Sequence, residues 1–287
     1  MSAFSDLLTS RPVICDGAVG TQLYSRSTAT DQCLDHLNLT QPDLVRSVHR
    51  DYVLAGAQIV ETNTFGANRV RLAGHDLADM VQEINLAGAR LARQEAGERA
   101  LVAGSIGPTG KILEPYGALS PEEAHDAFAE QAEALKDGGV DVIFVETMAD
   151  LSEATAAVQA ARHTGLPVVA QMSFAQEGRT MMGVAPAAAV RALEALGADV
   201  VGANCGTGFH DMLAVAREMV AVAERPVIAQ PNAGFPQLVE GRMVYMSSPA
   251  YLADYARQFA DLGVAIIGGC CGTTPDHIRA IVEALRR

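Results

Sequence analysis

Residues 140–173, VDVIFVETMADLSEATAAVQAARHTGLPVVAQMS, decide the fold class. The stretch opens with an apolar run, Val140–Val145, that ends in the polar pair Glu146 and Thr147. A segment rich in alanine and long polar residues follows, and a second apolar run begins at Pro167. Strong helix formers between two short apolar runs indicate a strand, a helix and a second strand.

The same unit recurs along the whole chain, with little polar alternation inside the apolar runs. Strands buried on both faces have this composition. Eight units in 287 residues match a (β/α)₈ barrel, which typically takes ~250 residues. A doubly wound open sheet is the alternative, but it rarely needs eight such regular units. With no linker apparent, we predict a single α/β domain, a (β/α)₈ TIM barrel over residues 1–287. The predicted strands are Pro12–Cys15, Ala57–Val60, Ala100–Ala103, Val140–Val145, Pro167–Ala170, Ala198–Gly202, Pro226–Ala229 and Gly263–Ile267.

Helix boundaries between these strands are marked by side chains that cap helices. A hydroxyl near a first-turn proline predicts a start. Ser120 with Glu123 fits a capping box, and Asp150 with Glu153 fits one more loosely. Glycines such as Gly138 mark the ends. The hydroxyl–proline pairs are Thr40 with Pro42, Ser120 with Pro121, Ser248 with Pro249 and Thr274 with Pro275.

Charge and hydropathy exclude several classes of protein. The formal net charge of −13 repels phosphate backbones, which argues against nucleic acid and anionic membranes as partners. No apolar run reaches the roughly 18 residues of a membrane span, and Met1–Pro12 lacks the pattern of a signal peptide. We therefore expect a cytoplasmic protein with reduced thiols, in which the five cysteines are ligands, nucleophiles or core residues.

Polar residues gather at one end of the predicted strands, where the loops of a barrel build the active site. Asp16, Glu61 and Glu146 follow the first, second and fourth strands. Cys205 follows the sixth strand, and the pair Cys270-Cys271 follows the eighth. Such one-sided polarity predicts a pocket lined by carboxylates, amides and thiols.

The three cysteines at this end form a candidate metal site. Cys205, Cys270 and Cys271 end strands that are next but one around a barrel, so their thiolates could meet on one ion. Three soft ligands suit Zn²⁺ and leave a fourth position open, as in catalytic zinc sites. Two other interpretations stay open at this point: three buried core cysteines, or a redox pair formed by Cys270 and Cys271.

An open position on zinc would have a defined chemical use. A free alkyl thiol has a pKa near ~8.5, so little of it is ionised at neutral pH. A thiol that coordinates zinc loses its proton. The predicted site, with one Zn²⁺ per chain, would therefore make the thiol of a small substrate nucleophilic without a general base.

The motifs around these residues resemble those of the homocysteine S-methyltransferase family. The matching segments span nearly the whole chain, and GANCG together with GGCCGTTPDHI is highly specific. The likeness extends to cobalamin-dependent members and to bifunctional members that add a methylenetetrahydrofolate reductase. The matching segments are ICDGAVGTQL, LNLTQPDLV, HRDYVLAGAQIVETNTFGAN, AGSIGPTG, VETM, GANCGTG, QPNAGFP and GGCCGTTPDHIRAI.

The resemblance implies a homocysteine-binding domain that methylates this thiol to give methionine. Cys205, Cys270 and Cys271 match the zinc ligands of the family, which are also its catalytic thiolates. The acceptor's ammonium would meet two carboxylates, and its carboxylate would meet two backbone N–H groups. Another matching side chain would hold the fourth zinc position until substrate arrives. These further residues are Asp16 and Glu146 for the ammonium, Gly17 and Ala18 for the carboxylate, and Asn232 for the metal.

Other polar residues receive lesser roles. We expect Glu61 and Asn63 to orient neighbours, and Cys15 to point away from Asp16 into the core. Cys33 has no obvious partner, and the histidines form no ligand-spaced cluster.

The methyl donor is open at this stage. Candidates are methylcobalamin as an external donor, a sulfonium such as S-methylmethionine, or another methyl compound. A second hypothesis makes the chain a homocysteine-activating module that works only with a separate cobalamin- or folate-carrying protein. A third is a barrel hydrolase or lyase in which Glu146 and Asp16 act as an acid–base pair beside structural zinc.

Overall fold

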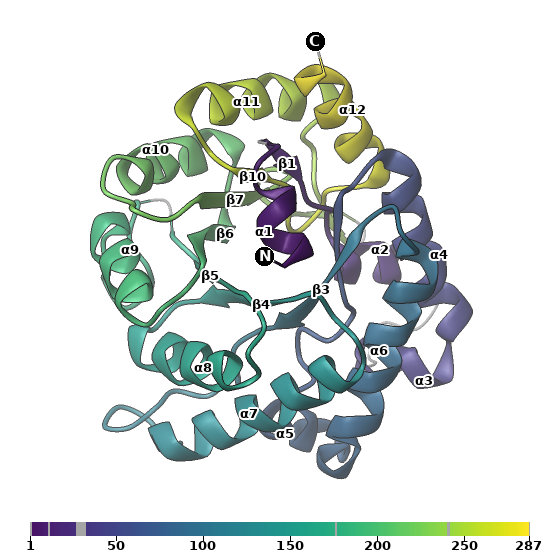
Figure 1. Cartoon of the computed structure of the whole chain (residues 1–287), viewed down its shortest axis with the longest axis vertical. Coiled ribbons are helices and arrows are strands. Elements are labelled where there is room, and N and C mark those ends of the chain that lie inside the picture. The colour runs from purple at the N-terminus through teal and green to yellow at the C-terminus, as the bar shows by residue number, and fades with distance from the viewer. Residues whose placement is uncertain (1, 11, 27–32, 176, 240–241, 287) are drawn as a thin grey trace.

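A computed structural model describes residues 2–10, 12–26, 33–175, 177–239 and 242–286. Eight parallel strands form one sheet in the order β1-β10-β7-β6-β5-β4-β3-β2. A bridge between Cys15 and Ile59 joins the two end strands, and the Asp16 amide donates to the Ile59 carbonyl at 3.0 Å. The sheet is therefore a nearly closed (β/α)₈ barrel, as predicted (Figure 1). The strands are β1 (Val13–Ile14), β2 (Ile59–Glu61), β3 (Leu101–Ile106), β4 (Val142–Met148), β5 (Val168–Met172), β6 (Val200–Gly208), β7 (Val227–Asn232) and β10 (Ile266–Ile267).

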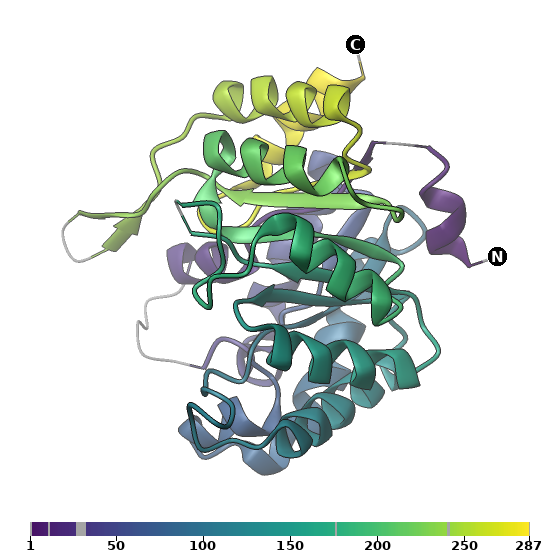
Figure 2. The same cartoon turned by 90° about the vertical axis from the view of Figure 1, so that its left-hand side faces the viewer.

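Helices surround the barrel, and each predicted strand lies at its expected place. An antiparallel hairpin, β8 (Gln237–Val239) with β9 (Arg242–Val244), follows β7. Figure 2 shows this hairpin and α1 at opposite ends of the barrel. Among the described residues, no helix is long and apolar enough to cross a membrane. The helices are α1 (Ala3–Leu7), α2 (Val19–Arg26), α3 (Leu37–Thr40), α4 (Pro42–Ala55), α5 (Arg69–Leu72), η1 (Ala73–His75), η2 (Ala78–Met80), α6 (Val81–Ala96), α7 (Pro121–Asp137), α8 (Leu151–His163), α9 (Pro186–Ala195), α10 (Phe209–Val220), α11 (Pro249–Leu262) and α12 (Pro275–Leu285).

The barrel interior is an apolar cluster built from every strand. Phe144 and Ile266 are fully buried in it, and Phe4 of α1 packs against the same cluster. Helix α1 thus covers the end of the barrel from which the strands start, away from the hairpin (Figures 1 and 2). The cavity lined by the predicted polar residues lies at the other end, at the carboxyl ends of the strands.

Most of the predicted helix boundaries are confirmed. Ser120 forms the capping box with Glu123, and Ser248 caps α11. The predicted cap at Thr40 is wrong, because Thr40 closes α3 and Gln41 precedes α4. Asp150 caps α8 through the Ser152 amide.

The predicted partner of Asp150 has another function. Glu153 accepts hydrogen bonds from the amide and the hydroxyl of Thr109, at 2.8 and 2.6 Å. The loose capping box is therefore not formed, since the carboxylate of Glu153 fixes the loop after β3 instead.

Candidate functional site

The loops after the strands enclose a cavity of about 380 Å³. Cavities of roughly this size and larger hold small-molecule ligands. Most of the predicted site residues line it; Asp16 and Asn232 are not among the lining residues and are 0% and 7% exposed. The predicted residues on the wall are Gly17, Ala18, Glu146, Cys205, Cys270 and Cys271.

The three predicted thiols meet at this cavity. The Sγ atoms of Cys205, Cys270 and Cys271 all lie within 4.8 Å of one another, and those of Cys205 and Cys271 are 3.9 Å apart. Cys205 lies where the register between β6 and β7 shifts, and its φ of 55° is in the left-handed region. A non-glycine residue held in this conformation is strained, which is typical of functional sites.

Backbone hydrogen bonds fix the cysteine pair against β7. The Cys270 amide donates to the Pro231 carbonyl at 2.9 Å, and the Cys271 carbonyl accepts from the Ala233 amide at 2.9 Å. The loop after β10 is therefore held beside Asn232, between these two contacts.

Hydrogen bonds among the thiols polarise the cluster. Those from Cys270 and Cys271 lower the pKa of Cys205 to about 3. Hydrogen bonds to Cys205 and Cys271 raise the pKa of Cys270 well above its usual range, and the hydrogen bond to Cys205 raises the pKa of Cys271 to about 12. The three sulfur atoms are thus close enough together for one cation to take the place of their protons.

The surroundings of the thiols fit a metal ion. The Asn232 side chain hydrogen-bonds to Cys205, yet its Oδ1 is buried without a hydrogen-bond partner. An unpaired buried carbonyl oxygen is costly unless something contacts it. Three sulfur donors with one free oxygen donor match the tetrahedral preference of Zn²⁺.

Three buried carboxyl groups lie near one another in the same region. Burial raises the pKa values of Asp16, Glu61 and Glu146. The negative charges of Glu146 and Asp16 raise the pKa of Glu61 further, and Glu61 hydrogen-bonds to Glu146. A cationic group placed here would be attracted to all three.

Glu146 is oriented by hydrogen bonds to both of its oxygens. Ser105 donates to Oε1 at 2.6 Å, and Asn204 donates to Oε2 at 2.9 Å. Asn204 also accepts from the Thr147 amide at 2.7 Å, and Thr147 is a second non-glycine residue with positive φ, 61°. These contacts hold the carboxylate in one orientation.

Glu61 lies at the end of a chain of amide side chains. Gln230 donates to Oε1 of Glu61 at 2.5 Å, and Gln171 donates to Oε1 of Gln230 at 2.8 Å. The backbone amide of Glu61 donates to Oδ2 of Asp16 at 2.9 Å. The backbone amide of Glu61 therefore orients Asp16, whereas the side chain of Glu61, expected only to orient neighbours, lines the cavity.

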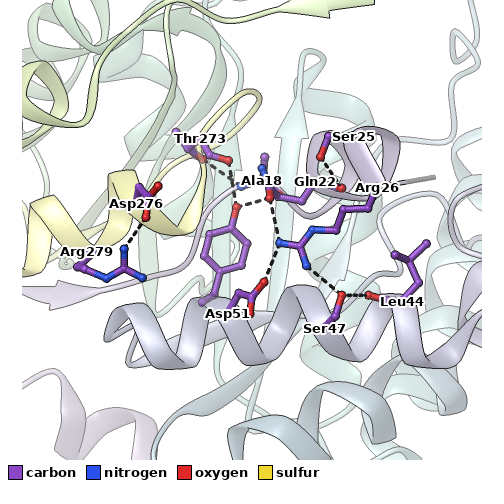
Figure 3. Close-up of polar contacts among 11 residues, drawn as sticks. Ala18, Gln22, Ser25, Arg26, Leu44, Ser47, Asp51, Thr273, Asp276 and Arg279 are labelled. Atoms are coloured by element: carbon purple, nitrogen blue, oxygen red, sulfur yellow. Dashed lines mark hydrogen bonds and ion pairs between the residues drawn. The ribbon is translucent and has the colours of Figure 1, made fainter. Parts of the chain in front are cut away.

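The loop after β1 is packed against the loop after β10. The Ala18 amide donates to Oγ1 of Thr273 at 3.0 Å, and the Tyr52 hydroxyl lies 3.0 Å from the Ala18 and Thr273 carbonyls. Figure 3 shows Ala18 and Thr273 side by side. A Cβ on Gly17 would lie 2.5 Å from Oγ1 of Thr273, so only glycine fits there.

This packing changes which amides face the cavity. Since Ala18 already donates to Thr273, an anion would be met by Gly17 and by the first turn of α2. Val19, Gly20 and Thr21 of that turn line the cavity. The first-turn amides of a helix have no intrahelical acceptor and favour anions.

The expected orientation of Cys15 is wrong. Its Sγ lies 3.6 Å from Oδ1 of Asp16 and 3.6 Å from Oε1 of Glu61. Strand alternation predicted the opposite, but β1 ends at Ile14, so Asp16 no longer obeys it. Cys15 is nevertheless a core residue, as predicted.

Other residues were missed or only partly placed from sequence. Cys33, assigned no partner, hydrogen-bonds to Asp35 at 3.7 Å. In the described part of the chain, no histidine belongs to a group of potential metal ligands. Sequence analysis missed Asn204, which orients Glu146, and Thr273, which accepts from the Ala18 amide. Both lie within the cysteine motifs, so their positions there could have pointed to them.

Comparisons with known proteins agree with this geometry. The profile described as "Homocysteine S-methyltransferase" matches residues 13–285. The chain is 38% identical to methionine synthases of Mycobacterium leprae and Mycobacterium tuberculosis over 98% of its length. It spans 25% of the length of these relatives.

Solved structures give the same family. The metallated form of the homocysteine methyltransferase MmuM from Escherichia coli superposes with a TM-score of 0.82 at 26% identity, covering 98% of this chain and 99% of that one. Its oxidized form gives a TM-score of 0.81 at 27% identity, covering 98% of each chain. The profile match over nearly the whole barrel and the two relatives lead to one conclusion: the chain belongs to the homocysteine S-methyltransferase family, a family of methyltransferases.

Proposed function

We propose that this chain transfers a methyl group to the thiol of homocysteine, giving methionine, with one zinc ion held by Cys205, Cys270 and Cys271. The observation that carries the proposal is the convergence of three Sγ atoms within 4.8 Å on the wall of a cavity that Glu61 and Glu146 also line. When bound, zinc would supply Lewis acidity that converts the acceptor thiol into a thiolate.

The protein side chains would position the acceptor. Its ammonium would lie against Asp16 and Glu146, where charge-assisted hydrogen bonds are strongest. Its carboxylate would be met by amides of Gly17 and the first turn of α2, and Ala18 supports this loop through Thr273. Positioning of this kind lowers reaction barriers by about 7–11 kcal/mol in favourable cases.

Asn232 would occupy the fourth position on the metal until the substrate binds. Its Oδ1 is buried without a hydrogen-bond partner, so it would be available as a fourth donor to the metal before the acceptor thiol binds. The metallated state of the Escherichia coli homologue supports a metal in this family.

A donor screen tests the proposal. Purified, reduced, zinc-loaded protein would be incubated with homocysteine and, separately, S-methylmethionine, methylcobalamin or betaine, and methionine would be quantified. Methionine formed from at least one donor, and lost in Cys205→Ala, is expected. Absence of methionine with every donor would contradict turnover by the chain alone.

A second candidate is a homocysteine-activating module that serves a separate methyl-carrier protein bearing cobalamin or folate. The chain spans only a quarter of its methionine synthase relatives. Loops beyond the strand ends also expose apolar side chains, Tyr116, Met181 and Leu238, at 80%, 86% and 70%. Homocysteine binding without turnover, converted to turnover by a methylated carrier protein, would favour this candidate.

A further inference from the structure

Tyr245 lies directly on the backbone of the cysteine loop. It follows β9, and its ring occupies the space beside Gly272. A Cβ added to Gly272 would lie 2.0 Å from Cγ of Tyr245, a distance that real structures never show. The φ of Gly272 is also +81°, so both the backbone and the space require glycine. The ring therefore covers the residue next to Cys271.

The hydroxyl of the same side chain reaches the thiol cluster. Burial raises the pKa of the Tyr245 hydroxyl, and the neighbouring Cys271 side chain raises it further, with smaller effects from Cys205 and Cys270. The residue is half-buried and does not line the cavity. It is therefore a neighbour of the thiol cluster that is separate from the residues lining the cavity.

The backbone around Tyr245 is tied to the same loop. The Ser247 amide donates to the Ala233 carbonyl at 3.2 Å, and the Ala233 amide donates to the Cys271 carbonyl at 2.9 Å. Nε2 of His277 hydrogen-bonds to the Ser247 carbonyl at 2.9 Å. These contacts hold the segment after β9 against the cysteine loop, so Tyr245 is kept in place by more than its own side chain.

We propose that Tyr245 is a positioning residue for the metal site: its hydroxyl donates to Sγ of Cys271, and its ring shields Cys271 from solvent. The inference rests on the proposed zinc site. Groups that hydrogen-bond to metal ligands orient them, and their loss typically costs 10–100-fold in metal affinity. A phenol remains protonated at neutral pH and can donate to a thiolate.

The test compares three variants. Tyr245→Phe keeps the ring and loses the hydroxyl, whereas Tyr245→Leu loses both. Tyr251→Phe is the matched control, because Tyr251 packs on Tyr255 in α11 and contacts none of the cysteines in the described structure. Zinc affinity would be measured by competition with a chromogenic chelator. Cobalt-substituted protein would report coordination geometry through its d–d absorption.

We expect Tyr245→Phe to bind zinc about tenfold more weakly or worse, while Tyr251→Phe matches the wild type. The cobalt d–d intensity should be the same in Tyr245→Phe and wild type, since no ligand is lost. Wild-type zinc affinity in Tyr245→Phe would overturn the proposal. A drop in cobalt d–d intensity would overturn it as well, by making Tyr245 a ligand itself.

A metal-independent measurement separates this inference from the proposed function. If the wild type binds no zinc, the zinc proposal fails, and the alkylation rate of Cys271 in metal-free protein then decides the role of Tyr245. Faster alkylation in Tyr245→Leu than in wild type, with Tyr251→Phe unchanged, supports shielding. Equal rates in all three proteins would contradict it.

Discussion

The side-chain amide of Asn204 donates to Oε2 of Glu146 at 2.9 Å. The same nitrogen lies 2.7 Å from Oγ1 of Thr147 and 3.9 Å from Sγ of Cys270. Asn204 directly precedes Cys205 in the chain. One buried amide therefore contacts both the carboxylate proposed to hold the acceptor's ammonium and a thiol proposed to hold the metal.

Substitution of Asn204 should weaken acceptor binding more than metal binding. We expect Asn204→Ala to raise the homocysteine dissociation constant by about tenfold or more, because a hydrogen bond to a charged group contributes about 1.5–3 kcal/mol. Zinc content should stay near that of the wild type. Calorimetric titration with homocysteine and metal analysis provide both values.

A matched change on the other oxygen of Glu146 separates the two roles of Asn204. Ser105→Ala removes the 2.6 Å hydrogen bond to Oε1 but leaves Asn204 and Thr147 in place. Ser105→Ala should weaken homocysteine binding while the hydrogen bonds between Asn204 and Thr147 stay intact. Homocysteine affinity unchanged in both variants would contradict the proposed role of Glu146.

Neutralising Asp16 should reduce acceptor affinity without removing the metal. Asp16→Asn keeps the shape of the side chain and its ability to accept from the Glu61 amide, but it loses the charge opposite the ammonium. We expect homocysteine to bind about tenfold to a hundredfold more weakly. Glu153→Gln is the control, since Glu153 is also buried but bonds to Thr109 outside the cavity. Equal losses in both variants would indicate general destabilisation instead.

The buried His49 should make the fold sensitive to acid. Both ring nitrogens of His49 lack hydrogen-bond partners among the described residues, and burial lowers the pKa of His49 from 6.5 to about 4. As the pH falls below 6.5, His49 becomes protonated in the unfolded chain but stays neutral in the folded chain until the pH nears 4. The free energy of unfolding should therefore fall between pH 6.5 and about 4.

Replacement of His49 isolates this effect. The stability of His49→Leu should exceed that of the wild type increasingly as the pH falls, by about 3 kcal/mol near the lower limit. Urea denaturation across this pH range measures the difference. The exposed His75 provides a control, and His75→Leu should show no such pH-dependent difference. A constant difference for His49→Leu would show that His49 ionises freely in the folded state.

The barrel and its polar end were predictable because they depend on local patterns. Apolar runs such as Val140–Val145 predicted the strands, and the polar residues after these runs predicted the wall of the cavity. Contacts between loops could not be derived this way. The alternation rule failed at Cys15, since β1 ends at Ile14 and the Cys15 thiol lies beside the Asp16 carboxylate. The hairpin that brings Tyr245 onto Gly272 leaves no periodic signal in the sequence.

The zinc content of the purified, reduced protein tests the central claim most directly. The proposed site predicts close to one zinc per chain in the wild type, and loss of that zinc in Cys205→Ala and in Cys271→Ala. Cys33→Ala should keep its zinc, because Cys33 lies with Asp35 and outside the thiol cluster. A wild-type protein that is free of metal and still methylates homocysteine would contradict the account.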